Sequence, residues 1–590
     1  MSLKTSTLSA AIILSLLVCG ANAAAAKTSL TITSPANGAR VSGEVRVATR
    51  ESANVSWINV YVDNVWVASN PSSAAPPYSI MWNSRTVNNG LHRVSVNGYN
   101  SANAVIAQRA ILVNVANRVT IPTATPTPAP TPTVTATLTP TATRTATPTP
   151  APTRTPTPTA TPSGVSYYVA PSGSDSNNGS AGSPWRTIQH AANVLVQGQT
   201  AIVQAGNYGE RVTISSSGTA SAPITLQAAS GADVRMLGFN LSGSYWVING
   251  FDISTQTNGS NGIGIYISNS ASNDTVENNY IHELCHEGIV MDPTVSYISV
   301  INNRSWRAEM AGAQVDGLYD LIEGNEVWET QQTPVALGGI YSACVTPGGA
   351  DADAFRFFGQ HHVFRSNYMH DIAYGTTVNP NPHNDCFQTW GSSAMTVDDI
   401  LFERNLCRWP AASDSINNEV SMVEGLDGAV GTLTYQNNVF SNMRQGINVG
   451  VNVATLKVFN NTWDHIVEEA IIFNDSRGSA DEIVNNIFYD VGSSGDSYAC
   501  IPSGSPTIES NDFFMPGGAS LGSWCSNAPY TSVDPKFVNY GDATGAGADF
   551  HLQSTSPVIA DGTTLSTVTN DYDGIARPAG SGYSLGAYQK

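Results

Sequence analysis

Three segments of this chain begin with an acid and continue as short, mostly apolar strands: DAFRFFG from Asp353, DCFQTWG from Asp385 and EVSMVEG from Glu419. If they lie on adjacent turns of one structure, their carboxylates stack about 4.8 Å apart. Carboxylates this close repel one another unless a cation or a shared proton relieves them. Calcium prefers hard oxygen ligands, so we predict a bound calcium ion. Its predicted ligands are Asp351, Asp353, Asp385 and Glu419.

Side chains that could move a proton or hold a ligand lie in the same part of the chain. Arg356 and Gln388 each follow a column acid by three residues, which in a straight strand places them on the opposite side of the strand plane. His383 lies two residues before Asp385, and a neighbouring carboxylate could orient its ring for proton transfer. The predicted catalytic residues are Arg356, His383 and Asp385, and the predicted substrate contacts are Trp390, Gln388, Trp409 and Glu424. Long loops are also polar simply because they are solvated, which is the plainer explanation of these residues.

A repeated asparagine sets the elements that must position these side chains. It recurs in phrases such as VENNYI, VINNRS, FERNLC and VFNNTW. The nine aligned asparagines, 22 to 42 residues apart, are Asn279, Asn303, Asn325, Asn367, Asn405, Asn438, Asn461, Asn486 and Asn511. A period of this size indicates a solenoid whose repeats bury their apolar faces against their neighbours. The alternating Val, Ile, Phe and Tyr indicate strands, and three short strands per turn of about 22–25 residues are typical of a parallel β-helix.

Asparagine also suits the corner of each turn. It tolerates left-handed backbone angles, so we expect the repeated asparagines to adopt them, with their amides bonding from turn to turn. The spacing is longest between Asn325 and Asn438, and insertions in repeat proteins form loops on the binding face. We therefore expect a groove there, with Asp353, Arg356, His383 and Asp385 at exposed positions in its centre.

The N-terminus and the charge favour an exported protein. Lys4 precedes an apolar run from Ala10 to Val18, and Ala21-Asn22-Ala23 fits a signal-peptidase site, so residues 1–23 are predicted to be a signal peptide. The run is too short to span a membrane. The net charge of −19 disfavours nucleic acid and anionic membranes as partners. We expect a secreted, extracellular monomer.

Six cysteines follow the predicted signal peptide. An even number in an exported chain favours disulfides over a metal site, and no C-x-x-C pair suggests zinc. Cys386–Cys407 and Cys500–Cys525 are the predicted pairs, because each would close one loop. Cys285 and Cys344 are then left to pair with each other.

Two modules precede the repeats. Residues 28–117 alternate as an antiparallel β-sandwich does, and the phrases SPANGARVSGEVRV and VYVDNVWVAS resemble bacterial immunoglobulin-like domains. We expect a spacer or a weak adhesion module with Trp57 and Trp66 in its core. Residues 118–163 are almost entirely Thr, Pro and Ala, a composition that predicts a disordered linker.

The segment that follows, YYVAPSGSDSNNGSAGSPWRTIQHAANVLVQGQTAIVQAGNYGERVTI, resembles the start of the pectate-lyase-like right-handed β-helix superfamily, especially its secreted polysaccharide lyases. DYDGIARPAGSGYSLGAYQ resembles the closing segment of the same proteins. The resemblance implies an all-β catalytic domain at residues 165–590 that acts on a pectate-like, uronic-acid-containing polysaccharide. An apolar stripe predicts a short helix that caps the solenoid, formed by Ile188, Ala191, Ala192 and Leu195.

The resemblance also implies a mechanism. In such lyases calcium neutralises the uronate carboxylate and acidifies the proton at C5, which a basic side chain, usually Lys or Arg, removes. Lysine is scarce in the predicted β-helix, so the base would be Arg356 or His383. The lysine-bearing motif of calcium pectate lyases and the catalytic set of polygalacturonase-type hydrolases are both absent. Three alternatives stay open: a glycoside hydrolase with paired carboxylates, a uronate C5-epimerase, and a non-catalytic polysaccharide-binding or adhesin scaffold.

Overall fold

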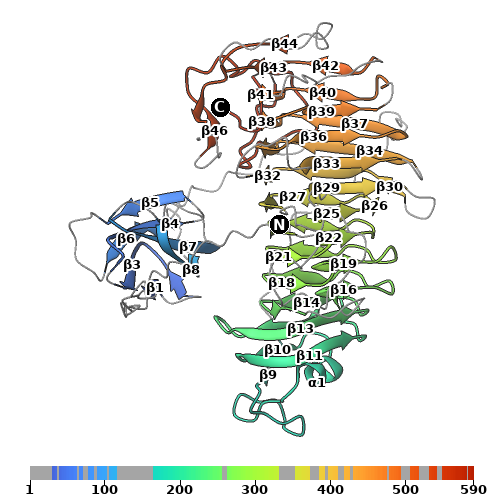
Figure 1. Cartoon of the computed structure of the whole chain (residues 1–590). Coiled ribbons are helices and arrows are strands. Elements are labelled where there is room, and N and C mark those ends of the chain that lie inside the picture. The colour runs from blue at the N-terminus through green and yellow to red at the C-terminus, as the bar shows by residue number, and fades with distance from the viewer. Residues whose placement is uncertain are drawn as a thin grey trace, which may run out of the picture. The chain divides into compact units, whose positions relative to one another are not determined.

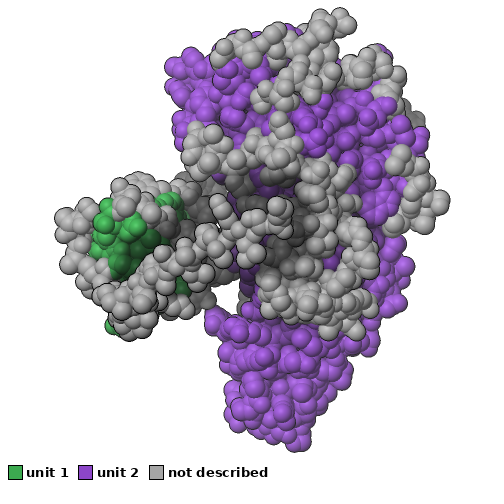
Figure 2. All heavy atoms as spheres, in the orientation of Figure 1, with its two compact units in different colours: residues 1–141 green, residues 142–590 purple. Residues whose placement is uncertain are grey.

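The computed structural model of the chain divides into two compact units, residues 1–141 and 142–590 (Figure 2). The structure describes residues 30–590 except 36–38, 53, 63–64, 71–77, 85–89, 102–104, 116–163, 256–261, 331–351, 373–383, 392–395, 410–417, 426–428, 475–476, 493–504, 517–529, 541–547 and 581. The predicted signal peptide and linker lie outside the described residues, so these two boundaries stay predictions.

The first unit is a β-sandwich. Its strands are β1 (Leu30–Ser34), β2 (Ala39–Val41), β3 (Glu44–Glu51), β4 (Trp57–Val62), β5 (Val65–Ser69), β6 (Ser79–Asn83), β7 (Gly90–Tyr99) and β8 (Val105–Val115). One sheet has the order β1-β3-β6 and the other the order β2-β8-β7-β4-β5. The prediction that Trp57 lies in the core is wrong. Strand alternation turns Ile58 inward, so Trp57 is only half-buried and stacks on Tyr99 with ring centroids 3.9 Å apart. The side chain of Trp66 lies outside the described residues.

The second unit is a right-handed parallel β-helix with three stacks of strands (Figure 1). The first stack contains β9 (Ser166–Val169), β10 (Thr200–Val203), β12 (Ile224–Ala228), β14 (Trp246–Asn249), β17 (Thr275–Glu277), β20 (Ser299–Ile301), β23 (Leu321–Glu323), β27 (Val363–Arg365), β31 (Ile400–Glu403), β34 (Val430–Gln436), β37 (Val453–Phe459), β40 (Glu482–Val484) and β42 (Thr507–Glu509). Beside it lie β26 (Gly359–Gln360) and β30 (Val397–Asp398).

The second stack contains β15 (Asp252–Ile253), β18 (Tyr280–Leu284), β21 (Arg304–Ala308), β24 (Glu326–Trp328), β28 (Tyr368–His370), β32 (Leu406–Arg408), β35 (Val439–Ser441), β38 (Thr462–Ile466), β41 (Ile487–Val491), β43 (Asn511–Phe514) and β44 (Tyr530–Thr531). The third stack contains β16 (Ile265–Ile267), β19 (Ile289–Met291), β22 (Ala311–Val315), β25 (Asp353–Phe357), β29 (Asn384–Trp390), β33 (Asn418–Glu424), β36 (Gln445–Val449) and β39 (Ile471–Phe473). Two long strands, β11 (Gly206–Ile214) and β13 (Val234–Leu241), begin the second and third stacks, and β45 (Phe537–Asn539) pairs with β46 (Asp549–Leu552). The predicted three strands per turn are confirmed.

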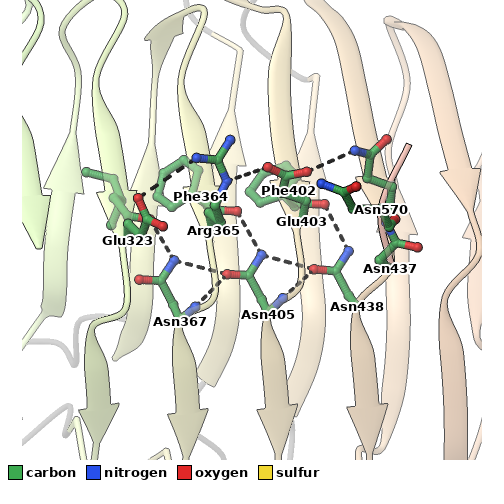
Figure 3. A network of polar contacts seen from close by, with 12 residues as sticks. Glu323, Phe364, Arg365, Asn367, Phe402, Glu403, Asn405, Asn437, Asn438 and Asn570 are labelled. Atoms are coloured by element: carbon green, nitrogen blue, oxygen red, sulfur yellow. Dashed lines mark hydrogen bonds and ion pairs between the residues drawn. The ribbon is translucent and has the colours of Figure 1, made fainter. Parts of the chain in front are cut away.

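The repeated asparagines form one continuous ladder between the first and second stacks. In Asn405, the backbone N–H and Nδ2 both donate to Oδ1 of Asn438, at 2.9 and 3.0 Å, and Nδ2 also donates to the carbonyl of Phe364 at 2.9 Å (Figure 3). The paired contacts between successive asparagines recur at every step from Asn279 to Asn511. Bonding from turn to turn is thus confirmed.

The left-handed backbone angle, however, does not belong to the ladder asparagines. It belongs to the residue before each of them, for example Asn302 at φ 53° and Asn437 at φ 54°. The chain turns at that residue, between the strands of the first and second stacks. The next residue then turns inward, where a buried amide can satisfy backbone groups that the corner leaves without partners.

A short helix, α1 (Ile188–Val194), lies at the end of the solenoid beside β9–β11 (Figure 1). Its cap is Thr187, whose hydroxyl accepts a hydrogen bond from the N–H of His190. The predicted stripe is confirmed, because Ile188, Ala191, Ala192 and Leu195 are all buried. In the part of the chain that the structure describes, no helix is long and apolar enough to span a membrane.

One predicted disulfide is confirmed. Cys386 in β29 is bonded to Cys407 in β32, with the Cα atoms 6.2 Å apart, so it links the third stack to the second. Cys285 is also disulfide-bonded. Cys344, Cys500 and Cys525 lie outside the described residues, and the other two pairings stay predictions.

Candidate active site

The three acids lie on adjacent turns of the third stack, as the register predicted. Asp385 pairs with Glu419, and the pairing of Phe355 with Phe387 places Asp353 beside Asp385. Oδ1 of Asp353 accepts the N–H of Asp385 at 3.2 Å, and Oδ1 of Asp385 accepts the N–H of Glu419 at 3.2 Å. The acid column, as we call these three residues, therefore also completes the backbone hydrogen bonding where the strands begin.

A cation and a proton relieve the repulsion within the acid column. Nε of Arg356 donates to Oδ2 of Asp353 at 2.7 Å. Burial, helped by the charges of Glu424 and Glu468, raises the pKa of the Glu419 carboxyl to about 8 against the lowering effects of Asn448 and Arg444, so Glu419 is mainly protonated at neutral pH. One arginine, the backbone N–H groups of Asp385 and Glu419, and one retained proton thus stabilise the three stacked acids.

Arg356 does not lie where a straight strand would place it. The ion pair between Nε of Arg356 and Oδ2 of Asp353 instead brings the two side chains together. Their expected exposure is also wrong. The side chain of Asp353 is 0% exposed and that of Arg356 is 6% exposed, while Asp385 is likewise buried. Buried charge of this kind is costly unless paired, so the arrangement favours a built site over a solvated loop.

Three of the predicted substrate contacts lie on the third stack, and the fourth, Trp409, lies on the second. Trp390 is half-buried at the end of β29, pairs with Glu424 of β33, and lies with its ring centroid 6.0 Å from Cζ of Arg356. Gln388 is buried and pairs with Arg356. The prediction for Trp409 is wrong, because its side chain is part of the apolar core. Trp409 directly follows β32 on the second stack, and the sequence could not distinguish this buried position from one in the groove.

In the described part of the predicted calcium set, most carboxylate oxygens already have a partner, and the calcium ion stays a prediction. Three of the four carboxylate oxygens of Asp353 and Asp385 already accept hydrogen bonds, and Arg356 adds a positive charge. Calcium needs about 6–8 oxygen ligands. Within the described ranges, no three His, Cys, Asp or Glu side chains are placed to hold a metal. Asp351 and His383 lie outside the described residues, so their roles stay predictions.

Three further residues extend the site along the axis. Glu287 and His286 lie below the acid column, and Arg444 lies above it, bonded through Nε to Glu468 at 2.8 Å. A signal for Glu287 was present in the sequence, since EGIVMD begins with an acid like the column strands. Glu287 lies before the inserted turns between Asn325 and Asn438, so the insertions did not single it out.

Comparison with known proteins identifies both modules. Residues 167–331 match the family model described as "Pel9A-like, right handed beta helix region", and residues 29–96 match "Bacterial Ig domain". Over these residues the chain is similar to a Pel9A-like right-handed β-helix region and to a bacterial immunoglobulin-like domain. The matched range includes His286 and Glu287 and ends before the acid column.

Curated relatives give the same picture. Pectate lyase L of Dickeya dadantii is 28% identical over 183 residues, which are 26% of this chain and 42% of that protein. The uncharacterized protein YwoF of Bacillus subtilis is 30% identical over 135 residues, which are 20% of this chain and 29% of that protein. The chain thus spans less than half the length of these relatives.

Solved structures include that of pectate lyase Pel9A, which aligns with a TM-score of 0.45 at 18% identity and covers 72% of this chain and 96% of that chain. The family match and the relatives make the chain a distant homologue of pectate lyases.

Proposed function

We propose that this protein is a secreted polysaccharide lyase that cleaves a pectate-like, uronic-acid-containing polysaccharide by β-elimination. The observation that carries the proposal is Arg356, a buried guanidinium among stacked acids on one face of a pectate-lyase-like β-helix. Elimination requires a fixed positive charge beside the uronate carboxylate, because that charge acidifies the proton on the adjacent carbon.

Arg356 suits the role of carboxylate clamp better than that of base. A guanidinium stays protonated in proteins, and its planar set of donors matches a carboxylate. The ion pair with Asp353 orients it and stabilises its charge. Asp385 lies on the next turn, where it contributes to the negative field of the site and positions the start of β33 through the N–H of Glu419.

The test is a panel of pectate, alginate and glycosaminoglycan substrates, each read for near-ultraviolet absorbance and for reducing ends. We expect both signals on one uronate polymer, because elimination leaves an unsaturated sugar at each new end. Polymer binding without either signal would show that the chain is a scaffold rather than an enzyme.

A glycoside hydrolase is the second candidate, and one observation favours it. Glu419, whose pKa is raised to about 8, lies one turn from Asp385, so a protonated acid and a carboxylate are neighbours on the same face. A hydrolase would produce reducing ends without ultraviolet absorbance. The panel therefore separates the two candidates in one experiment.

Calcium and export are proposals with their own tests. Chelation with EDTA followed by calcium addition should leave turnover unchanged if Arg356 supplies the positive charge, and a calcium-restored rate would instead support the ligand set that includes Asp351. Export predicts a mature N-terminus at Ala24, which sequencing of the secreted protein measures.

A further inference from the structure

Several histidines of the described β-helix have both ring nitrogens engaged. His370, His465 and His551 each lie between two carboxylates. The ring of His362 is fully buried and contacts the backbone through both nitrogens. Contacts on both sides fix a ring but leave no nitrogen to accept a proton from a substrate.

His286 differs from these residues. Its Nδ1 lies 2.8 Å from Oε2 of Glu287, and Nε2 has no hydrogen bond to any residue that the structure describes. The side chain of His286 is 30% exposed, whereas that of Glu287 is 7% exposed. A buried carboxylate therefore orients a half-exposed ring and leaves its second nitrogen available to a ligand.

The position of His286 relates it to the acid column. The N–H of Gly288 donates to the carbonyl of Ala311 at 2.9 Å, and Ala311 pairs with Asp353. Glu287 thus occupies the column position two turns before Asp353, about 10 Å away along the axis. The position between them is held by Ala311, so no charged side chain separates His286 and Glu287 from Asp353 and Arg356 along the column.

The electrostatics of the two residues are coupled to the same site. The hydrogen bond to Glu287 raises the pKa of His286 against the effect of burial, the charges of Glu287 and Glu309 raise it further, and Arg356 lowers it. Burial alone would raise the pKa of Glu287, but the hydrogen bond and charge of His286, with a smaller contribution from Arg356, outweigh it and lower that pKa. Glu287 is therefore ionised, and Arg356 lies close enough to act on both groups.

We propose that His286 is the general base of this site and that Glu287 is its positioning residue. This inference rests on the proposed lyase function. Nε2 of the neutral ring takes the proton from C5 of a uronate whose carboxylate is bound by Arg356. The electrons of the C5–H bond form the C4=C5 double bond, the C4–O bond breaks, and the leaving oxygen takes a proton from water.

The experiment measures kcat and KM of the full chain on the polymer identified by the panel, from acid to alkaline pH. His286→Gln should lower kcat/KM about 100-fold or more with KM little changed, and added imidazole should restore part of the activity of His286→Ala. Glu287→Gln should move the acidic limb of the pH profile by about one unit or more to lower pH. The direction follows because loss of the carboxylate lowers the pKa of His286, so the neutral ring persists at lower pH.

His361→Asn is the matched control. Nδ1 of His361 also pairs with a carboxylate, that of Asp399 at 2.7 Å, and its side chain is 35% exposed. It lies on the turn after β25, stacked on Tyr319, at a left-handed position that asparagine tolerates. We expect wild-type kinetics from this variant.

Thermal unfolding of each variant separates loss of chemistry from loss of fold. If the wild type cleaves the polymer and His286→Gln, folded, keeps its rate and pH profile, the inference is overturned while the lyase function stands. A wild type that yields no unsaturated product overturns the lyase function and this inference together.

Discussion

Individual residues in the site combine structural and chemical roles. The carboxylates of Asp353 and Asp385 each accept a hydrogen bond from a backbone N–H of the next turn. Asp353 also accepts a hydrogen bond from Arg356. Replacement by alanine would therefore remove buried hydrogen bonds together with charge. Substitutions that keep size, such as Arg→Lys or Glu→Gln, are the informative ones at this scale.

Arg356→Lys should lower kcat/KM about 10- to 100-fold, because an ammonium cannot reproduce the planar donors of the guanidinium. Steady-state kinetics on the cleaved polymer measure the effect. Arg304→Lys serves as the control, since Arg304 also bonds a carboxylate through Nε, that of Glu326 at 2.6 Å, but on the second stack. Equal losses in the two variants would count against a special role for Arg356.

Glu419→Gln should stabilise the protein relative to wild type more at alkaline than at acid pH. In the folded protein the Glu419 carboxyl, whose pKa is about 8, keeps its proton to a higher pH than in the unfolded chain. The wild-type protein therefore loses stability as the pH rises towards and through that value, and the glutamine variant does not. The difference in melting temperature between variant and wild type, measured at about pH 6 and pH 9, tests this. A difference that does not grow with pH would show that Glu419 is already ionised.

At the scale of elements, neighbouring corner residues have opposite requirements. Asn302 is exposed with φ 53°, whereas Asn303 is buried and bonds to Asn325 through both its N–H and its side chain. The first position requires a backbone conformation, and the second requires an amide. Of the two adjacent asparagines in the phrase VINNRS, the first therefore allows the left-handed turn and the second supplies the hydrogen bonds of the ladder.

Asn303→Ala should destabilise the protein by about 2–4 kcal/mol, because it leaves buried donors and acceptors on adjacent turns without partners. Asn302→Gly should change stability by less than about 1 kcal/mol, because glycine adopts the left-handed conformation freely. Denaturant unfolding measures both. The opposite ranking would mean that the ladder amides contribute less than the corner geometry.

At the scale of the whole β-helix, burial has neutralised a set of carboxyls. It raises the pKa of Asp274, Asp320 and Glu419 to about 8 and that of Asp316 and Asp512 to about 7. In the unfolded chain these groups ionise at their ordinary values, so between those values and about pH 8 the folded state binds more protons. Stability must then fall as pH rises through this window.

The melting temperature of the full chain should therefore be higher at about pH 5 than at about pH 9. Below about pH 4 it should fall again, because His370 and Arg304 lower the pKa of Glu326 to about 2 against the effect of burial, and its pairing is lost on protonation. Calorimetry across this range measures the curve. A maximum at alkaline pH would contradict the pKa values of the buried acids.

The sequence alone determined the periodic features of this protein. The asparagine spacing predicted three strands per turn and the amide ladder, the apolar stripe predicted the capping helix, and the register predicted that Asp353, Asp385 and Glu419 stack. These features could be predicted because translation along one axis maps equal positions of successive repeats onto one another. Cys386–Cys407 was predicted by loop closure.

Only the tertiary structure decided which way particular side chains point. An ion pair holds Arg356 to Asp353, the side chain of Trp409 packs into the core, and the corner places the left-handed angle at the residue before each ladder asparagine. The same packing placed Glu287 in line with the acid column, and His286 bonds to Glu287. Local bends and the contacts between turns set these directions, and a repeat period carries no information about either.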